Sequence, residues 1–294
     1  MKKFVKRLVA RLGRRHPELL VRLRYLVRFH KPIDLNHPKD LNEKIQYLSL
    51  RTDTSAWTRL SDKYAVREYV RECGLESILN TLYGVWDDAE AIDFDSLPQQ
   101  FILKATHGSG DGFVVEDKRQ LDVQEVRRIF RQTLKETYGL AEGNLHYSHI
   151  TPRIIAEELL VNDEWSARYS TSLIDYKFWC FNGRAHYILI CTNRTGTNKS
   201  ELMTYDTSWN PHPEYCVFNG HYLQGKPIPP PPNLDEMLQV SERLAAPFPV
   251  VRVDLYNLNG RILFGEMTFT SLGGFMNYYT PEFLQKAGSL INLP

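Results

Sequence analysis

The sequence has few cysteines and none of the cysteine spacings that mark metal-binding or redox proteins. Its 294 residues contain four, Cys73, Cys180, Cys191 and Cys216, with no C-x-x-C pair among them. This spacing excludes a zinc knuckle and a thioredoxin-like motif, and it supports no particular disulfide pairing. We therefore expect a reduced, cytoplasmic setting in which the cysteines remain thiols.

Long apolar runs and a strong overall charge are also missing. No stretch is long and apolar enough to cross a bilayer, and Lys and Arg interrupt the N-terminal apolar positions. We therefore expect neither a transmembrane helix nor a signal peptide. The net charge of +1 gives no general attraction to polyanions, and we expect no nucleic-acid partner. Hydrophobic residues at 43% and charged residues at 24% are typical of a folded globular protein.

The small net charge hides a strongly basic N-terminus. Residues 1–31 contain eleven Lys or Arg and one Glu, so the rest of the chain is acidic. The first apolar residues fall on one helical stripe, and Pro17 begins a second helical turn. This basic amphipathic segment, taken as 1–39, could lie peripherally on the anionic inner face of the plasma membrane. It could equally pack on its own domain as a solvated helix. We slightly favour the membrane, because an enzyme acting on lipid-linked sugars would gain from docking there.

The remaining chain predicts an α+β protein. Periodicity indicates helices over 40–50, 56–72, 123–138, 234–245 and 281–291. It indicates strands over 101–106, 113–115, 153–160, 173–181 and 185–192. The Asn-Gly pairs at 182–183 and 259–260 are favoured two-residue hairpin turns, since both residues tolerate positive φ. We expect antiparallel hairpins and flanking helices in two lobes, about 40–155 and 156–294.

A glycine-rich loop follows the strand at 101–106. Lys104 lies near the end of this strand, and His107, Gly108, Ser109, Gly110 and Gly112 follow it. Glycines let backbone N–H groups turn toward an anion, and a nearby ammonium neutralises phosphate. No Gly-Lys-Ser/Thr follows, and the loop leads to a strand instead of a helix, so it is neither a Walker A loop nor a dinucleotide fingerprint. An ordinary mobile hairpin would give nearly the same pattern.

The last predicted hairpin carries paired acids. Arg252 and Asp254 alternate on one strand, and Glu266 and Thr268 alternate on the other. Folding at the Asn-Gly turn should bring Asp254 opposite Glu266. Buried carboxylates need a counter-ion, and magnesium takes few carboxylates together with phosphate oxygens and water. The alternative is an exposed ion-pair surface, but the apolar residues between the acids favour a packed sheet and a metal site.

A third group lies between the other two. Glu157 and Glu158 end the strand at 153–160, and Asp175 and Lys177 lie on the strand at 173–181. An acid at a lobe junction can accept a hydrogen bond from adenine N6 or from ribose hydroxyls, and a lysine can reach a phosphate. Paired glutamates are also common on ordinary surface strands.

With these motifs in this order, the chain resembles the TupA-like branch of the ATP-grasp superfamily, found in teichuronopeptide and capsular polysaccharide gene clusters. The likeness extends from residue 40 to the C-terminus, and it is carried by LNEKIQYL (41–48), DKYAVREYV (62–70), GVWDDAEAIDFDSLP (84–98), ILKATHGSGDG (102–112), PRIIAEELL (152–160), DYKFWCFNGR (175–184) and VVRVDLYNLNGRILFGEMTFT (250–270). The resemblance implies two lobes that clamp Mg-ATP. It also implies a ligase that joins a carboxylate to an amine through an acyl phosphate, acting on a polysaccharide or sugar-acid precursor with an amine donor.

The resemblance also implies roles for individual residues. Those expected to contact the nucleotide are Lys63, Lys104, His107, the flap from Gly108 to Gly112, Glu157, Glu158 and Asp175. Arg252 and Lys177 are expected to stabilise the transferred phosphoryl group, and Asp254, Glu266 and Thr268 to hold Mg²⁺. Thr268 departs from the family pattern, which usually has an Asn there. Helices also replace the superfamily's strand-rich N-terminal domain, which often helps to bind the acceptor.

Three other functions remain open from the sequence. A glycosyltransferase would need a D-x-D motif, for which Asp93 and Asp95 are the candidates, although a solvated loop explains them better. A kinase acting on a sugar or lipid hydroxyl could use the same ATP site. A non-catalytic membrane scaffold would have no use for the ATP residues. His146 and His149 have helical spacing but no third ligand nearby, so we expect a structural role instead of zinc binding.

Overall fold

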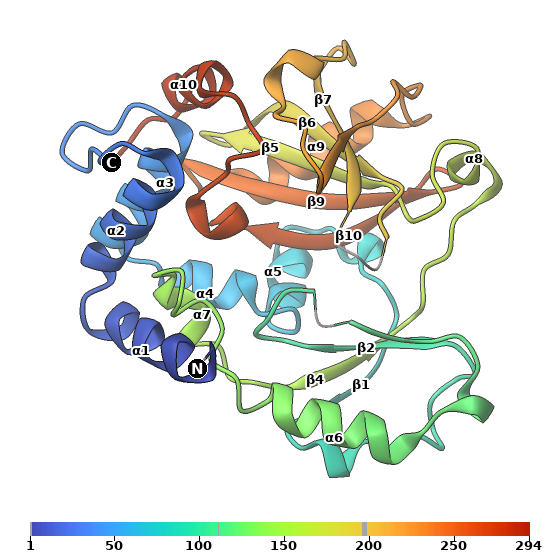
Figure 1. Ribbon diagram of the computed structural model, residues 1–294. Helices are drawn as coiled ribbons and strands as arrows, with labels where there is room; N and C mark the ends of the chain where they lie inside the picture. The colour runs from blue at the N-terminus through green and yellow to red at the C-terminus, as the bar shows by residue number, and fades with distance from the viewer. Residues whose placement is uncertain (1, 111, 196–198) are drawn as a thin grey trace.

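The chain folds around two β-sheets that face each other (Figure 1). The computed structural model describes residues 2–110, 112–195 and 199–294, with side chains of the first helix from residue 8 onward. The smaller sheet has the strand order β1-β4-β2-β3, and the larger one has the order β10-β9-β5-β6-β7-β8. Within the described residues all neighbouring strands are antiparallel except β7 and β8. This arrangement confirms the α+β prediction.

The strands of each sheet come from separate parts of the chain. The small sheet consists of β1 (Leu82–Trp86), β2 (Phe101–Ala105), β3 (Phe113–Val115) and β4 (Ile154–Glu157). The large sheet consists of β5 (Asp175–Phe181), β6 (Arg184–Thr192), β7 (Ser200–Asp206), β8 (Tyr222–Gln224), β9 (Val250–Leu258) and β10 (Arg261–Thr268). The sequence did not predict β1, β7 and β8. The strand predicted over 153–160 is shorter and belongs wholly to the small sheet.

Helices pack around both sheets (Figure 1). They are α1 (Lys2–Arg15), α2 (Pro17–Phe29), α3 (Leu41–Arg51), α4 (Ser55–Ser61), α5 (Val66–Glu72), α6 (Val123–Thr133), α7 (Leu145–Ser148), α8 (Glu164–Ala167), α9 (Leu234–Ala245) and α10 (Pro281–Ser289). Helix α6 lies under the small sheet, where Val126 and Phe130 pack against Phe101 and Leu103 (Figure 1). It ends at Thr133, earlier than the predicted 138.

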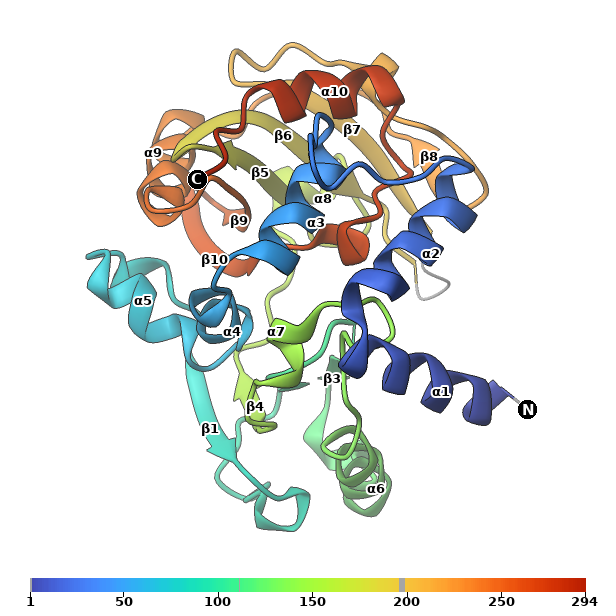
Figure 2. The ribbon, with the colours of Figure 1, turned by 90° about the vertical axis from the view of Figure 1, so that its left-hand side faces the viewer.

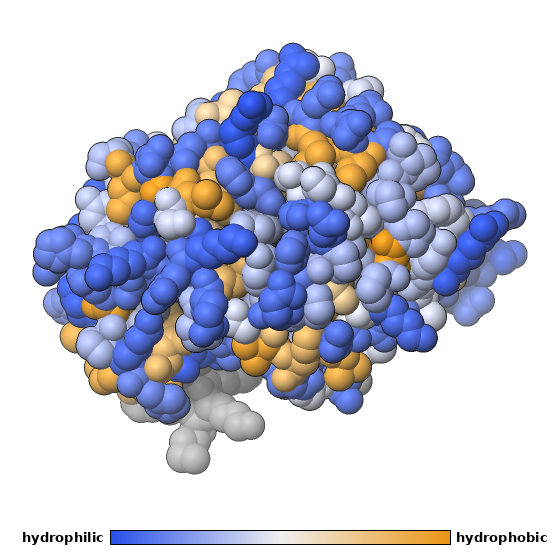
Figure 3. All heavy atoms as spheres, turned by 90° about the horizontal axis from the view of Figure 1, so that it is seen from above, coloured by the Kyte–Doolittle hydropathy of each residue, from blue (hydrophilic) through white to orange (hydrophobic). Residues whose placement is uncertain are grey.

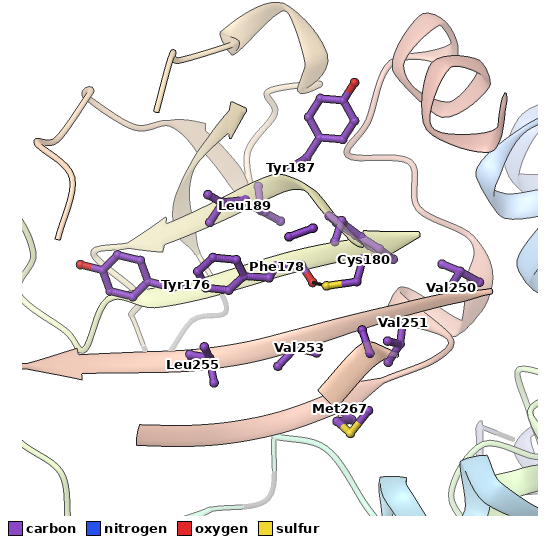
Figure 4. Close-up of a cluster of buried hydrophobic side chains, with 14 of the residues drawn as sticks. Tyr176, Phe178, Cys180, Tyr187, Leu189, Val250, Val251, Val253, Leu255 and Met267 are labelled. Atoms are coloured by element: carbon purple, nitrogen blue, oxygen red, sulfur yellow. Dashed lines mark hydrogen bonds between the residues drawn. The ribbon is translucent and has the colours of Figure 1, made fainter. Parts of the chain in front are cut away.

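The large sheet divides its residues between a core face and a cleft face. Tyr176, Phe178 and Cys180 of β5 pair with Leu255, Val253 and Val251 of β9 and form the apolar layer drawn in Figure 4. This layer packs under α9, where the thiol of Cys180 donates to the carbonyl oxygen of Ser241. Because strand side chains alternate, the residues between them point to the opposite face. Every residue of β5 is buried, so charged groups on that face are held in a packed sheet.

Helix 56–72 of the sequence prediction is interrupted by one turn. Asp62 accepts hydrogen bonds from the backbone N–H groups of Tyr64 (2.8 Å) and Ala65 (3.2 Å), which ends α4 and starts α5 after a short gap. The backbone N–H of Lys63 donates instead to the carbonyl oxygen of Thr106 (3.2 Å). The interruption therefore fixes Lys63 at the end of β2, beside the glycine loop.

The basic N-terminal segment packs on the rest of the protein through α2. Its buried residues Val21 and Tyr25 join a small core with Ile33, Leu35 and Phe275, and the Tyr25 hydroxyl donates to Asp40 (3.1 Å). Figure 2 shows α2 beside the turn that follows β10, with α1 extending away from it. No described helix is both long and apolar enough to span a membrane. Seen from above, hydrophilic residues cover most of the surface and hydrophobic ones gather in separate groups (Figure 3).

His146 is buried without hydrogen-bond partners. Both ring nitrogens lack a partner among the described residues, and the ring packs edge-on against Trp57 with centroids 5.6 Å apart. No described group of three or more His, Cys, Asp or Glu is arranged to hold a metal. Burial lowers the pKa of His146 to about 3. The position is therefore a packing site for a neutral ring, in line with the expected structural role.

We predict that His146 weakens the fold in mild acid. Between pH 6.5 and 3 the unfolded state binds a proton that the folded state excludes, so stability falls as pH decreases through this range. The loss should approach about 1.4 kcal/mol per pH unit. Urea unfolding at pH 7.5 and 5.5 should show a smaller pH dependence for His146→Phe than for the wild type. His149→Gln, at an exposed position, is the control, and an unchanged pH dependence in His146→Phe would contradict the assignment.

Candidate active site

Residues from both sheets line one cavity of about 280 Å³ between the lobes. Lys104 and Glu157 reach it from the small sheet, and Lys177, Asp254 and Glu266 reach it from the large one. Leu160, on the segment that joins the two sheets, also lines it. The structure thus brings the lysine and the acids that the sequence singled out to one cleft.

Asp254 is the centre of the charged network on the large sheet. Its carboxylate receives a bidentate pair of hydrogen bonds from Arg252, Nε to Oδ1 at 2.6 Å and a terminal nitrogen to Oδ2 at 2.7 Å. Lys177 donates to the same carboxylate (2.5 Å) and to Asp175 (3.3 Å). Arg194 completes the chain by pairing with Asp175. All of these groups except Arg194 are buried.

These contacts favour the charged form of each partner. Burial by itself would raise the pKa of Asp254, but Arg252 and Lys177 outweigh it and the pKa is lowered. Burial would likewise lower the pKa of Lys177, but Asp175 and Asp254 outweigh it and the pKa is raised. The sequence argument required a metal as counter-ion for the acids. The structure supplies Arg252 and Lys177 instead, so charge balance alone does not require a metal here.

Glu266 lies opposite Asp254, as expected, but a β-bulge that the sequence did not predict brings it there. A regular hairpin closed at Asn259-Gly260 would place Gly265 opposite Asp254. The register instead shifts between Phe264 and Glu266, so Glu266 pairs with Asp254. Glycine is needed at the bulge, since a Cβ on Gly265 would lie 2.8 Å from the backbone oxygen of Asp254. The extra residue turns Glu266 to the same face as Asp254.

Glu266 and Thr268 differ in how free they are to bind a ligand. The Glu266 side chain is 42% exposed, and its Oε1 receives hydrogen bonds from Arg252 (3.2 Å) and Thr268 (3.0 Å). The Thr268 hydroxyl also accepts from Arg252 (3.1 Å). The Thr268 hydroxyl is therefore engaged with Arg252 and Glu266, and it positions both side chains.

A second set of ion pairs centres on Glu157 of the small sheet. Glu157 receives hydrogen bonds from Lys104 (2.9 Å) and from Arg67 (3.0 Å). Arg67 also donates to the carbonyl oxygen of Asn80 (2.7 Å), and both residues line the cavity. Sequence reasoning missed Arg67, Asn80 and Arg194 as site residues. The only signal for Arg67 was its position one helical turn after Lys63.

The glycine loop lies over this cleft. Lys63 donates to the carbonyl oxygen of Gly108, and Ser109, Gly110 and Gly112 line the cavity. Residue 111 lies outside the described residues. Gly110 has a positive φ of 74° and open space around its Cβ position. The loop therefore presents glycine backbone beside Lys63 and Lys104.

Two predicted site residues, His107 and Glu158, line neither this cavity nor the larger one described below. His107 is buried, its Nε2 lies 3.1 Å from the carbonyl oxygen of Glu136, and its Nδ1 has no partner. The Glu158 side chain accepts a hydrogen bond from the Thr81 hydroxyl (3.0 Å) and lines a different, shallow cavity beside Tyr83 and Leu159. Adjacent strand residues point to opposite faces, so Glu157 and Glu158 could not both face the cleft.

The arrangement just described has a counterpart in known protein families. The family model described as TupA-like ATPgrasp matches residues 43–292. The chain belongs to the TupA-like ATP-grasp family. A comparison with curated proteins finds no match.

Three solved proteins align with this TupA-like protein. D-alanine–D-alanine ligase from Bacillus anthracis aligns with 13% identity and a TM-score of 0.46, covering 86% of this chain and 66% of that one. L-amino acid ligase from Bacillus licheniformis aligns with 12% identity and a TM-score of 0.48, covering 86% and 56%. The D-cycloserine synthetase DcsG aligns with 13% identity and a TM-score of 0.45, covering 80% and 70%. The TupA-like chain thus spans about two thirds or less of the first and second of these proteins.

We predict that Gly265→Ala disrupts the pairing of the two acids. The added Cβ must move the backbone of β9 or β10, which should cost about 1–3 kcal/mol of unfolding free energy and displace Glu266. Urea unfolding measures the first effect, and weakened binding of a fluorescent ATP analogue with Mg²⁺ measures the second. Gly220→Ala is the control, because a Cβ there meets no atom within 4 Å. Wild-type stability and nucleotide affinity in Gly265→Ala would show that the bulge is unimportant.

Proposed function

We propose that this TupA-like ATP-grasp protein is an ATP-dependent carboxylate–amine ligase acting on a cell-surface polysaccharide precursor. The observation that carries the proposal is the single cleft in which lysines and a glycine loop from one lobe face acids from the other. Family membership supports ATP as the nucleotide. The acceptor would be a sugar acid or a similar carboxylate, with a separate amine donor.

The residues present fit Mg-ATP. Lys63, Lys104 and the glycine backbone would hold the phosphates, and Asp175 would lie near the ribose. Asp254 and Glu266 would hold Mg²⁺, because this ion commonly takes one or two carboxylates and completes its shell with phosphate and water oxygens. When bound, Mg²⁺ would neutralise phosphate charge. Glu266, which is partly exposed and has one oxygen with no partner among the described residues, is the readier ligand.

In the proposed reaction an oxygen of the acceptor carboxylate attacks the γ-phosphorus of ATP, and the bond to the ADP oxygen breaks. The amine nitrogen then attacks the acyl carbon, the carbon–oxygen bond to phosphate breaks, and one proton is released. Arg252 and Lys177 would offset charge on the transferred phosphoryl group, and the protein would otherwise act by positioning. No protein nucleophile is needed.

The other candidate functions differ in support. Asp93 accepts hydrogen bonds from the backbone N–H groups of Asp95 (3.1 Å) and Ser96 (3.4 Å), the local pattern of a surface turn. Neither aspartate lines any of the three cavities described for this chain. This removes the basis for a D-x-D glycosyltransferase. A kinase would use the same ATP cleft and is separated from a ligase by its product.

Product identification tests the proposal. Incubation with Mg-ATP, a panel of sugar acids and hydroxylamine should give ADP, phosphate and a hydroxamate, because hydroxylamine captures an acyl phosphate. Glu266→Gln should lower turnover by about 10²-fold or more and leave the urea midpoint nearly unchanged, since this side chain is partly exposed. Glu282→Gln, on the exposed side of α10, is the control.

A phosphorylated alcohol without hydroxamate would identify a kinase, and UDP release from UDP-sugars would identify a glycosyltransferase. Normal turnover in Glu266→Gln would remove the metal assignment. Asp254→Asn is a poorer test, because it leaves Arg252 and Lys177 buried without their carboxylate, which should itself cost about 3–5 kcal/mol.

We further propose that α1 holds the protein on anionic membrane. Five of its seven cationic residues, Lys2, Lys3, Lys6, Arg7 and Arg11, would each contribute about 1 kcal/mol near such a surface. Changing all five to Gln should raise the concentration of phosphatidylglycerol vesicles needed for half-binding at least about tenfold. Adding 0.5 M NaCl should have the same effect on the wild type, because roughly 0.1 M salt already screens surface charges beyond about 10 Å.

Removing five exposed charges elsewhere, Arg119, Arg128, Arg131, Lys135 and Lys226, is the matched control for membrane binding. Equal vesicle binding by both variants and the wild type would contradict membrane docking. Deletion of the whole segment 1–31 would not test it, because α2 contributes Val21 and Tyr25 to the core.

A further inference from the structure

A second and larger cavity, about 1030 Å³, opens directly from the ATP cleft. Lys63, Ser109 and Glu266 line both cavities. Arg252 and Thr268 line only the larger one, and both donate hydrogen bonds to Glu266, which lines both. A carboxylate held in this second cavity would meet the triphosphate at the shared residues, so it is the place for the acceptor of the proposed reaction.

Helix α2 forms the outer wall of this cavity. Leu23, Arg24, Val27 and Arg28 line it, and they recur at the spacing that places residues on one side of a helix. The opposite wall contains Leu272 of the 3-10 helix η5 (Ser271–Gly274), and Figure 2 shows this turn beside α2. The basic N-terminal segment thus contributes to a site as well as to the surface.

The mouth of the cavity is apolar. Val27 is 76% exposed, Leu23 47% and Leu272 42%, and Tyr138 is also among the exposed large hydrophobic residues that line the cavity. Four such side chains around one opening are more than a random scatter of surface apolar residues would give. They give the cavity an apolar rim, whereas its buried lining contains both apolar and polar residues.

Two arginines lie at the same end as the apolar rim. Arg24 is 3.7 Å from Glu142, a long and weak pair. Arg28 donates to the neutral side chain of Asn277 (2.7 Å) and forms no ion pair among the described residues. Glu142 also lines the cavity, so this end has two arginines against one carboxylate and keeps a net positive charge, a setting suited to a phosphate.

The interior of the cavity also lacks partners for buried polar atoms. Asn144 and Thr270 line it and are 2% and 4% exposed. Asn144 Oδ1 and the Thr270 hydroxyl have no hydrogen-bond partner among the described residues. Such atoms cost stability unless a ligand or water satisfies them, and sugar hydroxyls are suitable partners.

We infer that this cavity binds a sugar-acid acceptor linked through a phosphate to an apolar chain. The carboxylate lies toward Lys63 and Arg252, the sugar hydroxyls meet Asn144 and Thr270, the phosphate lies between Arg24 and Arg28, and the chain leaves over Leu23 and Val27. The inference rests on the proposed ligase function, since it names that reaction's acceptor class.

Binding of simple amphiphiles tests the phosphate and chain positions without knowledge of the sugar. With the ATP cleft filled by Mg²⁺ and a non-hydrolysable ATP analogue, decyl phosphate below its micellar concentration should bind about tenfold or more tightly than methyl phosphate or decyl glucoside in calorimetry. Arg24→Ala/Arg28→Ala should remove the advantage over decyl glucoside, and Leu23→Ser/Val27→Ser should remove the advantage over methyl phosphate.

Matched controls use residues outside the cavity. Leu19→Ser/Leu26→Ser changes two apolar residues of α2 that are each 49% exposed but do not line the cavity. Arg128→Ala/Arg131→Ala removes two charges from α6. Both control variants should bind decyl phosphate like the wild type.

The inference is overturned if the three compounds bind equally, if the advantages persist in the cavity variants, or if the controls lose them as well. Binding of the ATP analogue is measured separately in each variant. Loss of amphiphile binding with normal nucleotide binding would refute this inference alone, whereas a wild type that binds no Mg-ATP would refute the proposed function.

Discussion

The cleft depends on one buried carboxylate, that of Asp254. It joins Arg252 to Lys177, and Lys177 in turn joins it to Asp175 and Arg194. Charges alternate along this chain, and Glu266 at its end balances the last arginine. A buried ion network of this kind is stable only while each charge keeps its partner. The large sheet therefore presents a neutral, fixed surface toward the small lobe.

A neutral surface cannot by itself hold a triphosphate, so the additional positive charge must come from elsewhere. The small sheet and the segment from α4 to α5 provide it, because Glu157 is paired with two cations, Lys104 and Arg67, and Lys63 lies beside the glycine loop. Under the proposed function, these residues would attract the triphosphate and the large sheet would position it. It also explains why Mg²⁺ would be required for phosphate charge although the acids are already balanced without it.

Sequence periodicity predicted the main features of this cleft but missed those that depend on irregular backbone. The alternation of Arg252 with Asp254 and of Glu266 with Thr268 follows from strand geometry. The bulge at Gly265 does not, and without it Glu266 would lie opposite Val253 on the other face of the sheet. The prediction of paired acids was therefore correct for an incomplete reason. A glycine inside an apolar strand was the available signal.

The sequence alone could not identify site residues that only tertiary contacts bring to the cleft. Arg67 looks like any helix cation until the fold places it beside Glu157, and Arg194 follows a strand with no motif around it. His107 shows the reverse error, because its place next to the glycine loop suggested a ligand contact. The structure turns its ring into the interior. Sequence neighbours of a loop share its position along the chain, but they do not share the direction of its side chains.

The N-terminal helices form part of the wall of the larger cavity. The inner face of α2 is part of a core with Phe275, and Phe275 also lines the larger cavity. The same packing therefore holds the helix in place and fixes its outer residues beside the cavity. Preorganised side chains lose less entropy when a ligand binds. A short helix anchored in this way can position a phosphate and an apolar chain at one end of the cavity while Arg252 and Glu266 define the other.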